Sequence, residues 1–598
     1  MTLDYGIIGN CRTAALISKT ASLDWCCFPK FDDPSVFAKL LDNKKGGSFE
    51  ILPIEKYTIK QEYQKNTNIL ETTFSNKKSK FKIIDFFIRY KEPSEEKARK
   101  DNRLYRLIKV LKGNPEVKII FNPKLDYARG KTTLKLAHNA LMSKNKKQTL
   151  FLHSSLDVSN ILKKKPITLK NNDYLILSFG EECKVHNSEL VTGLLDKTID
   201  YWKTWVNRST WPKFYREKVV RATLALKLLT YDETGAVVAA PTTSIPEELG
   251  KGRNWDYRFC WLRDSSFTIN ALTRVCHFDA ALRYLGFLKR ALLNKKGEKP
   301  NLQAVYGIDG SKNLNEKVLK HLSGYKNSKP VRIGNVAYKQ KQLDSAGEAI
   351  YTIHEFYVHY RYKKELDEEL WKLVQDLADY ILHVWRQKDH GIWEFRKTQK
   401  HFTFSKMMAW VALDKAIEIA KFFKKKLDIS KWEETRELIK QDILEKAFNK
   451  KKQAFTMSYK SDELDASILL MPYYDFINPK FGKMKTTIAA IEKELATGCL
   501  MKRYKKDESG ESKNAFLICS FWLIDALYLS GNKKKAKALF RRVLNYGNHL
   551  GLFSEDINPR TGELLGNFPQ AYTHIALINS AVLLSGKGMR RPTCKIAI

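Results

Sequence analysis

The chain has 598 residues and a formal net charge of +39, and 43% of its residues are hydrophobic and 12% aromatic. That length exceeds one ordinary hydrophobic core, and the apolar content excludes an intrinsically disordered chain. The positive charge suits nucleic acid, an anionic membrane or an acidic substrate, but no nucleic-acid motif accompanies it, so a solvated lysine-rich surface is the favoured interpretation.

Residues 1–190 are predicted to form a domain of β-strands. Short runs rich in β-branched and aromatic residues recur there, separated by Asn, Gly, Lys and Pro. This spacing is typical of an antiparallel β-sandwich. The expected strands cover 67–75, 81–90, 104–113, 117–123, 148–155 and 173–180.

The pattern changes near residue 190, after which helical stretches continue to the end of the chain. Residues 194–209 have a helical period and predict a helix within a linker at 191–212. The number of later helices matches six helical hairpins closed in a ring. We therefore expect a multidomain β + α protein, with an N-terminal antiparallel β-sandwich at 1–190 followed by an (α/α)6 barrel at 213–598. The expected helices of the barrel cover 215–230, 263–275, 279–293, 345–362, 367–387, 405–424, 432–447, 465–472, 484–494, 514–530, 532–546 and 570–585.

Cysteine usage and apolar runs bear on location. The nine cysteines are irregularly spaced and form no CxxC pair, which is typical of a reduced, cytosolic protein. No basic segment followed by an apolar stretch opens the sequence, so no secretory signal is expected. The longest apolar run, 515–529, is interrupted by Asp525 and is too short to span a bilayer. A cytoplasmic location is expected, and export by a route without a cleaved signal stays open.

Charged and aromatic side chains alternate in the loop GRNWDYRFCWLRD, at 252–264. This pattern fits neither a helix core nor a strand core. It suits a sugar site, in which an Asp or Arg grips hydroxyl groups and an indole covers the apolar face of the ring. A structural ion-pair network at a helix start is the alternative.

Glu394 lies between Trp393 and Phe395 in DHGIWEFR, at 389–396. A carboxylate is costly to bury among apolar groups without a partner. An apolar, aromatic setting favours the neutral form of a carboxyl, so the sequence predicts Glu394 as a proton donor. A surface residue caught between two core aromatics is the alternative.

Glu555 lies in a third loop motif, GLFSEDINPRTGELLGNFPQAYTHI, at 551–575. On this motif alone, a solvated loop acid is the better interpretation. Together with Glu394, however, it provides two carboxyls on separate loops at one end of a helical ring. Glycoside hydrolysis needs one protonated carboxyl to donate to the leaving oxygen and one ionised carboxylate to activate water or attack.

Several long motifs, in order along nearly the whole chain, resemble glycoside hydrolase family 15, the group of glucoamylases, glucodextranases and prokaryotic trehalases. Residues 5–42 resemble the N-terminal module of its prokaryotic members. Four further segments resemble the barrel motifs of the family: NWDYRFCWLRDSSFT, GIWEFR, HFTFSKMMAWVALDKA and NPRTGELLGNFPQAYTHIALI. The resemblance implies a β-sandwich followed by an (α/α)6 barrel, in agreement with the pattern of strands and helices.

The resemblance also implies roles for individual residues. Glu394 resembles the general acid of the family and Glu555 its general base. Arg263 and Asp264 resemble the pair that holds the hydroxyls of the terminal glucose, and Arg503 resembles a further sugar-binding arginine. Three tryptophans are expected to line the pocket: Trp255, Trp261 and Trp393.

Three positions depart from the family pattern. Phe395 stands where fungal glucoamylases carry a second acidic residue, although prokaryotic members commonly have an apolar residue there. Cys11 replaces a common glycine, and Lys397 replaces the glycine that often follows the acid motif. The last two departures are expected to alter the leaving-group side of the site, and therefore the choice of substrate.

The leading prediction is an inverting, exo-acting α-glucosidase that releases β-D-glucose from terminal bonds of α-glucans or malto-oligosaccharides. A trehalase of the same family, a disaccharide phosphorylase, and a non-catalytic polyanion- or glucan-binding protein are the alternatives. The expected partner is a sugar substrate: glycogen, a starch-type glucan, or trehalose. No nucleic-acid partner, membrane span, cofactor or metal is expected, because proton transfer between two carboxyls needs no metal and no ligand cluster is visible.

Overall fold

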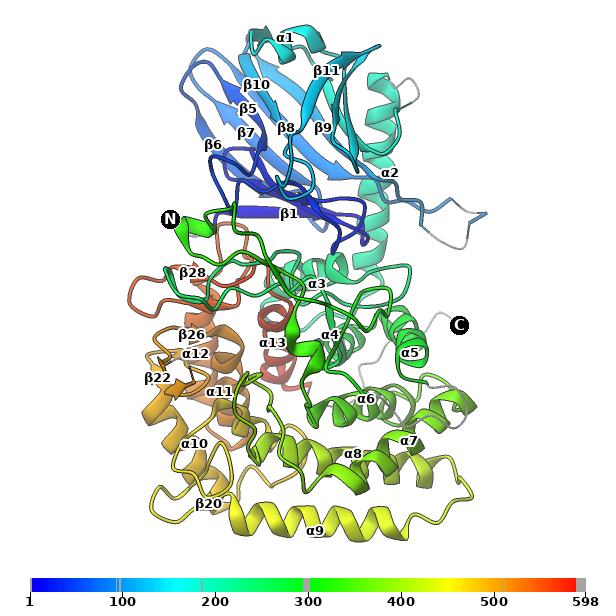
Figure 1. The fold of residues 1–598 in the computed structure, drawn as a ribbon, viewed down its shortest axis with the longest axis vertical. Helices are drawn as coiled ribbons and strands as arrows, with labels where there is room; N and C mark the ends of the chain where they lie inside the picture. The colour runs from blue at the N-terminus through cyan, green and yellow to red at the C-terminus, as the bar shows by residue number, and fades with distance from the viewer. Residues whose placement is uncertain are drawn as a thin grey trace.

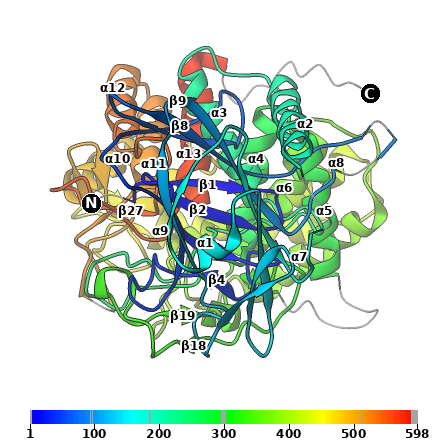
Figure 2. The same cartoon turned by 90° about the horizontal axis from the view of Figure 1, so that it is seen from above.

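The computed structural model describes residues 3–92, 94–95, 98–183, 187–293, 302–508 and 510–587. The two large sheets gather at one end of the molecule and most of the helices at the other (Figure 1). Seen from above, the strands lie over the helical part (Figure 2). The expected order of an antiparallel β-domain followed by a helical domain is therefore confirmed.

Two antiparallel sheets form the β-domain within the described residues. Arg106, on β9 of the larger sheet, donates to the carbonyl oxygen of Phe49, on β5 of the smaller sheet, at 3.1 Å. The two sheets therefore pack face to face. The smaller sheet contains β1 (Tyr5–Gly9), β2 (Ala14–Ser18), β3 (Leu23–Cys27), β4 (Ser35–Phe37), β5 (Ser48–Pro53), β10 (Glu116–Asn122) and β14 (Pro166–Thr168). The larger sheet contains β6 (Thr58–Tyr63), β7 (Leu70–Ser75), β8 (Lys80–Phe87), β9 (Arg103–Lys112), β11 (Thr133–Ala137), β12 (Ala140–Lys144), β13 (Thr149–Ser154) and β15 (Tyr174–Phe179).

The smaller sheet lies next to the helical domain. The indole N–H of Trp25, on β3, donates to the carbonyl oxygen of Pro241 at 2.8 Å. The strands β1 to β3 are almost fully buried, and none of them shows the alternation of a half-exposed strand. The sequence patterns predicted none of these three strands for this reason.

A long helix, α2 (Ser188–Asn207), runs along the sandwich toward the helical domain (Figure 1). Trp205 near its end stacks on His277, with ring centroids 3.7 Å apart. This is the helix expected at 194–209. The division of the chain into 1–190, 191–212 and 213–598 stays a prediction.

Eleven α-helices and one 3-10 helix form the ring of the second domain within the described residues, in two sets that alternate along the chain. The first helix of the outer set is also buried along most of its length. The inner set consists of five α-helices and one 3-10 helix that are buried nearly all round, as inner elements of a ring must be. They are α4 (Leu262–Arg274), α6 (Asp344–His354), α8 (Thr403–Phe422), η4 (Ala466–Leu470), α11 (Leu517–Leu529) and α13 (Ala571–Val582). The other six alternate with them along the chain: α3 (Arg216–Leu229), α5 (Phe278–Leu292), α7 (Glu368–Val384), α9 (Ser430–Lys446), α10 (Gly482–Leu495) and α12 (Lys533–Leu544). The expected (α/α)6 barrel is confirmed, and the stretch at 465–472 is the 3-10 helix.

The inner elements place polar side chains at their N-terminal ends. Arg263 and Asp264 open α4, Asp344 opens α6, and Tyr572 lies in the first turn of α13. These ends carry the positive pole of the helix dipole and unsatisfied backbone N–H groups, which favour negative charge. This end of the barrel is therefore suited to hold buried acidic side chains. None of the helices in the described part of the chain combines the length and the apolar character needed to cross a bilayer.

Candidate active site

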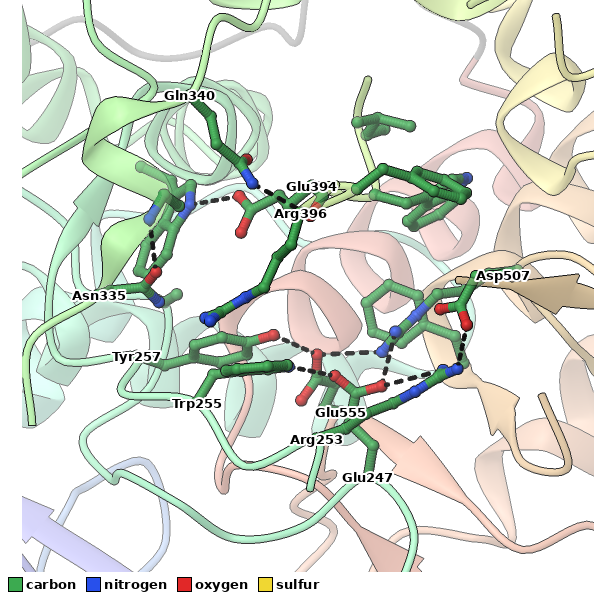
Figure 3. A pocket seen from close by; sticks show the side chains of 18 of the residues that line it. Glu247, Arg253, Trp255, Tyr257, Asn335, Gln340, Glu394, Arg396, Asp507 and Glu555 are labelled. Carbon is green, nitrogen blue, oxygen red and sulfur yellow. Dashed lines mark hydrogen bonds and ion pairs between the residues drawn. The ribbon is translucent and has the colours of Figure 1, made fainter. Parts of the chain in front are cut away.

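All eight site residues predicted from the sequence line one cavity of about 200 Å³ at this end of the barrel. They are Trp255, Trp261, Arg263, Asp264, Trp393, Glu394, Arg503 and Glu555. Glu394 and Glu555 lie on opposite sides of it, with Tyr257 between them (Figure 3). The loops that carry the three motifs therefore converge on one site.

Glu394 occupies a strained turn in the loop between α7 and α8. Its φ is 59°, a conformation that residues other than glycine rarely adopt. Gly391, three residues before Glu394, has a φ of 67°, and a Cβ there would lie 2.7 Å from the ring of Phe402. Backbone bonds between Asp389 and Lys400, at 3.1 and 3.0 Å, close the base of the loop. The local fold thus holds one carboxyl in a fixed position.

Polar donors surround the carboxyl of Glu394. Its Oε1 accepts hydrogen bonds from Trp261 Nε1 at 2.6 Å, Gln342 Nε2 at 3.3 Å and Arg263 Nη2 at 3.4 Å. The side-chain amide of Gln340 donates to the backbone carbonyl of Glu394 at 3.2 Å. These donors come from two other loops and fix the orientation of the carboxyl.

The aromatic neighbours of Glu394 in sequence serve other contacts. Trp393 donates its indole N–H to Asp465 at 2.9 Å. Phe395 packs between Phe402 and Tyr504, with ring centroids 5.2 and 5.7 Å away. The prediction that Trp393 and Phe395 give Glu394 an apolar setting is therefore wrong, because the turn at Glu394 brings its carboxyl to hydrogen-bond donors instead.

Glu555 is buried at the opposite side of the cavity, with 2% of its surface exposed. Its Oε1 accepts hydrogen bonds from the Tyr257 hydroxyl at 2.7 Å and from Arg503 Nη2 at 3.2 Å. Its Oε2 is buried and has no hydrogen-bond partner among the described residues. An ionised carboxylate with one free oxygen is suited to accept a proton.

Close backbone packing fixes the position of Glu555. Its N–H donates to the carbonyl of Asn567 at 3.2 Å, and its own carbonyl accepts from the N–H of Leu517, at the start of α11, at 3.1 Å. Gly566 has a φ of 73°, and a Cβ there would lie 2.7 Å from Glu555 Cβ and 2.8 Å from Oε2. Glycine is therefore required at this position.

Glu555 belongs to a cluster of three carboxyls around one guanidinium. Oxygens of Glu247, Glu555 and Asp556 lie within 4.8 Å of one another. Arg503 Nη1 lies 2.8 Å from Glu247, and its Nη2 lies 2.9 Å from Asp556 and 3.2 Å from Glu555. Arg253 Nη1 adds a second positive charge, 4.0 Å from Glu247. Two positive charges among three acids still leave an excess of negative charge, so the cluster favours retention of a proton.

Burial is the largest cause of shifted pKa values in this cluster. It raises the pKa of Glu555, and the charges of Glu247 and Asp556 raise it further, while Arg503 opposes them. Burial also raises the pKa of Asp556 to about 8, again with Arg503 opposing. The two carboxyls share one environment, so their ionisations belong to the cluster as a whole.

Arg263 and Asp264 lie side by side at the start of α4. Arg263 Nη1 donates to Asp344 and to Gln342 Oε1, both at 2.9 Å, and its Nε donates to the hydroxyl of Tyr572. Burial raises the pKa of Asp264 to about 7, and the charge of Arg263 opposes that rise. Protein groups therefore hold Arg263 firmly, and its remaining contact is with Glu394.

The indole N–H groups of three tryptophans all donate to carboxylates. Trp255 donates to Glu247 at 3.0 Å, Trp261 to Glu394 and Trp393 to Asp465. Each ring is anchored through its polar edge, so its position in the cavity wall is set by a hydrogen bond.

Several residues of the site were missed by sequence reasoning. Glu247, Gln340 and Gln342 lie in loops without a distinctive pattern. Tyr257 and Asp556 lie next to predicted site residues, inside motifs that were recognised. The nearness of Tyr257 and Asp556 to predicted site residues in the sequence was the one signal that pointed to them. That nearness does not specify which groups they contact.

Comparison with known proteins agrees with this geometry. A family model described as glycosyl hydrolases family 15 matches residues 213–582, and one described as trehalase-like, N-terminal, matches residues 4–164. A trehalase of Thermoplasma volcanium is 33% identical over 603 residues, covering 99% of this chain and 94% of that relative. A trehalase of Mycolicibacterium smegmatis is 33% identical and covers 97% of this chain and 90% of its own length. Trehalase 1 of Sulfolobus acidocaldarius is 34% identical, with 96% and 97% covered.

Among solved structures, a bacterial glucoamylase in complex with acarbose superposes with a TM-score of 0.71 at 14% identity. The match covers 98% of this chain and 94% of the glucoamylase, and it supports the fold. With the family model and the relatives, it leads to one conclusion: the chain belongs to glycoside hydrolase family 15 and is a glycoside hydrolase.

Proposed function

We propose that this protein hydrolyses trehalose to glucose by inversion, with Glu394 as general acid and Glu555 as general base. The observation that carries the chemistry is the pair of oriented carboxyls on opposite sides of one small cavity. The choice of trehalose rests on the curated relatives, which are named trehalases and match almost the whole chain. Glucoamylase-type action on α-glucans, the leading prediction from sequence, becomes the second candidate.

Glu394 is assigned as the proton donor because its motif resembles that of the family's general acid, and the arrangement around its two oxygens indicates which oxygen carries the proton. Trp261, Gln342 and Arg263 all donate to Oε1. We therefore assign the proton to Oε2, from which it passes to the oxygen between the two glucose rings. Breaking that bond leaves the departing glucose neutral.

Glu555 is assigned as the base that deprotonates the attacking water. Tyr257 and Arg503 both donate to its Oε1, which favours the ionised form. The carboxyl of Asp556 accepts from Arg503 at 2.9 Å and from no other described group. We therefore assign the proton retained by the cluster to Asp556, which leaves Glu555 free to act through Oε2.

Arg263 and Asp264 are proposed to hold the glucose whose bond is cleaved. Both lie deep in the cavity, with 5% and 4% of their surfaces exposed. Arg503 links the base cluster and is held by three carboxyls, so its main role is to balance charge around Glu555. Hydroxyl contacts of the sugar would strengthen as positive charge develops on the ring in the transition state.

The stereochemistry of the products tests the proposal directly. Trehalose joins two α-glucose units, so inversion gives one β-glucose from the attacked ring and one α-glucose from the leaving ring. A retaining enzyme would give two α-glucose molecules. Proton NMR of a fresh hydrolysate, read before mutarotation, is expected to show the two anomers in equal amounts.

Substrate choice is tested by kcat/KM on trehalose, maltose, maltotetraose, isomaltose and glycogen. We expect the highest value on trehalose. A higher value on maltotetraose or glycogen would favour the glucoamylase-type candidate. Turnover that requires phosphate and releases a sugar phosphate would instead identify a disaccharide phosphorylase.

A further inference from the structure

The outer wall of the cavity differs in character from its inner wall. Arg263, Asp264 and Glu555 are buried, whereas Arg396 and Lys397, which also line the cavity, are exposed. The side chain of Arg396 extends from the backbone beside Glu394 toward Trp255 (Figure 3). It therefore lies where the cavity opens to solvent.

Two contacts hold the Arg396 side chain in place. Its Nη2 lies 2.9 Å from Glu316 Oε2, and its Nη1 lies 3.5 Å from Oε1. Its guanidinium carbon lies 3.9 Å from the ring centre of Trp255. A forked ion pair and a stacked aromatic ring together fix the plane of a guanidinium. A single exposed ion pair does not fix that plane.

Glu316 is held in turn by a second arginine. Arg332 Nε lies 3.1 Å from Glu316 Oε1. Arg332 Nη1 donates to the carbonyls of Gly252 and Asn254, both at 2.9 Å, and its guanidinium carbon lies 4.5 Å from the ring centre of Trp255. Residues Trp255, Glu316, Arg332 and Arg396 thus form one connected unit, which we call the Arg396 clamp.

The clamp stands on the leaving-group side of the scissile bond. If Arg263 and Asp264 hold the attacked glucose, the leaving oxygen must lie at Glu394, and the leaving sugar must extend outward. Arg396 follows Glu394 by two residues and stands on that outward path. A longer chain would have to pass it.

We propose that the Arg396 clamp limits the leaving-group side to one sugar ring, so that the site selects disaccharides over longer glucosides. This inference rests on the proposed glucosidase function and names the length of its substrate. Arg396 lines the cavity and keeps N–H groups that Glu316 does not use, and these can donate to hydroxyls of the leaving ring. The clamp therefore both binds the second ring and excludes a third.

The test compares maltose with maltotetraose, because these substrates share one linkage and differ in length. We expect Arg396→Ala to raise the ratio of kcat/KM for maltotetraose to that for maltose by about tenfold or more, a size usual for steric discrimination in a pocket. Glu316→Gln is expected to shift the ratio in the same direction by less, because it frees Arg396 without removing it.

Arg129→Ala is the matched control. Arg129 has a side-chain exposure of 35%, against 34% for Arg396. It also pairs with a carboxylate, Asp126, and lies 5.4 Å from the ring centre of an aromatic residue, Tyr127, but outside the cavity. The ratio of kcat/KM for maltotetraose to that for maltose should be the same in Arg129→Ala as in the wild type.

An unchanged ratio in both Arg396→Ala and Glu316→Gln would overturn the clamp, as would a wild-type protein that cleaves maltotetraose as well as maltose. If maltose is cleaved and trehalose is not, the trehalase proposal is wrong. The ratio of kcat/KM for maltotetraose to that for maltose would then still test the Arg396 clamp. If no glucoside is cleaved, calorimetric titration of maltose and maltotetraose against wild type and Arg396→Ala replaces kcat/KM. A preference for maltose that Arg396→Ala abolishes would then support the clamp, and equal affinities in the wild type would overturn it.

Discussion

Trp261 donates its indole N–H to Glu394 across 133 positions of sequence, at 2.6 Å. Trp261 is the residue immediately before α4, and Glu394 lies in the loop after α7. The bond joins two of the loop motifs and orients the proposed acid. It is the shortest of the three hydrogen bonds to Oε1.

Removing this donor should slow catalysis without unfolding the protein. Trp261→Phe keeps an aromatic ring but loses the N–H. Glu394 becomes charged as it gives up its proton in the transition state, and a hydrogen bond to a charged group contributes about 1.5–3 kcal/mol, so we expect kcat/KM on trehalose to fall about 10- to 100-fold. Trp432→Phe is the control, because Trp432 donates to Asp379 at 2.9 Å outside the cavity. Equal losses in both variants would make the Trp261 bond structural.

The roles of the two carboxyls can be separated with a substrate that needs no acid. Glu394→Gln should lower kcat on trehalose by about 10²–10⁴-fold, a typical loss for a general acid. α-Glucosyl fluoride has a good leaving group, so its hydrolysis by this variant should stay close to the wild-type rate. Glu555→Gln should lose activity on both substrates. The reverse pattern would exchange the assignments.

The helical architecture could be predicted because most of the helices are long, and because outer helices such as α5, α7 and α12 bury one apolar face. Every one of the twelve expected helical stretches overlaps a helical element of the barrel. The strands β1 to β3 could not be predicted, because they are short and buried and therefore lack alternation. A strand that is enclosed by a second sheet and a helical domain has no exposed face. Its sequence therefore lacks the alternation of apolar and polar residues that predicts a strand.

The site was predictable where it rests on single motifs and unpredictable where it rests on contacts between them. Glu394 and Glu555 were found from their own loops. The grouping of Glu247 with Asp556 around Arg503 depends on three distant segments meeting, which no local pattern encodes. The same holds for Gln342, whose amide contacts both Arg263 and Glu394.

The charge of Glu247 should set the acidic limit of activity. After burial, this charge is the largest cause that raises the pKa of Glu555. Activity requires ionised Glu555 and is therefore lost as pH falls through the raised pKa of Glu555. Glu247→Gln removes the negative neighbour, so the acidic limb of kcat/KM should move to lower pH. Glu563→Gln, which removes a charge from the loop that carries Glu555, should leave the limb in place.

Asp556→Asn should alter the pH dependence of stability. Below about pH 4 an aspartate is protonated in the folded and the unfolded chain alike. As pH rises toward about 8, the unfolded chain releases this proton before the folded one does, so the free energy of unfolding falls. Asp556→Asn lacks this loss. Its melting temperature relative to wild type should therefore increase between pH 4 and pH 8, and parallel profiles would contradict the raised pKa.

Gly566 offers a test of how closely the position of Glu555 is controlled. Gly566→Ala would introduce a Cβ 2.7 Å from Glu555 Cβ, in a backbone conformation with a φ of 73°. Gly562 lies in the same loop with a φ of 72°, but a Cβ there would meet nothing closer than 3.7 Å, at Tyr546. The two alanine variants thus share the backbone strain, about 1–2 kcal/mol for a left-handed residue, and differ in the contact with Glu555. We expect both variants to melt at a lower temperature than the wild type, with the larger fall in Gly566→Ala, but a kcat that drops about 100-fold in Gly566→Ala alone, because small displacements of a catalytic group are costly. A matching loss of kcat in Gly562→Ala would show that loop strain, and not the displacement of Glu555, limits catalysis.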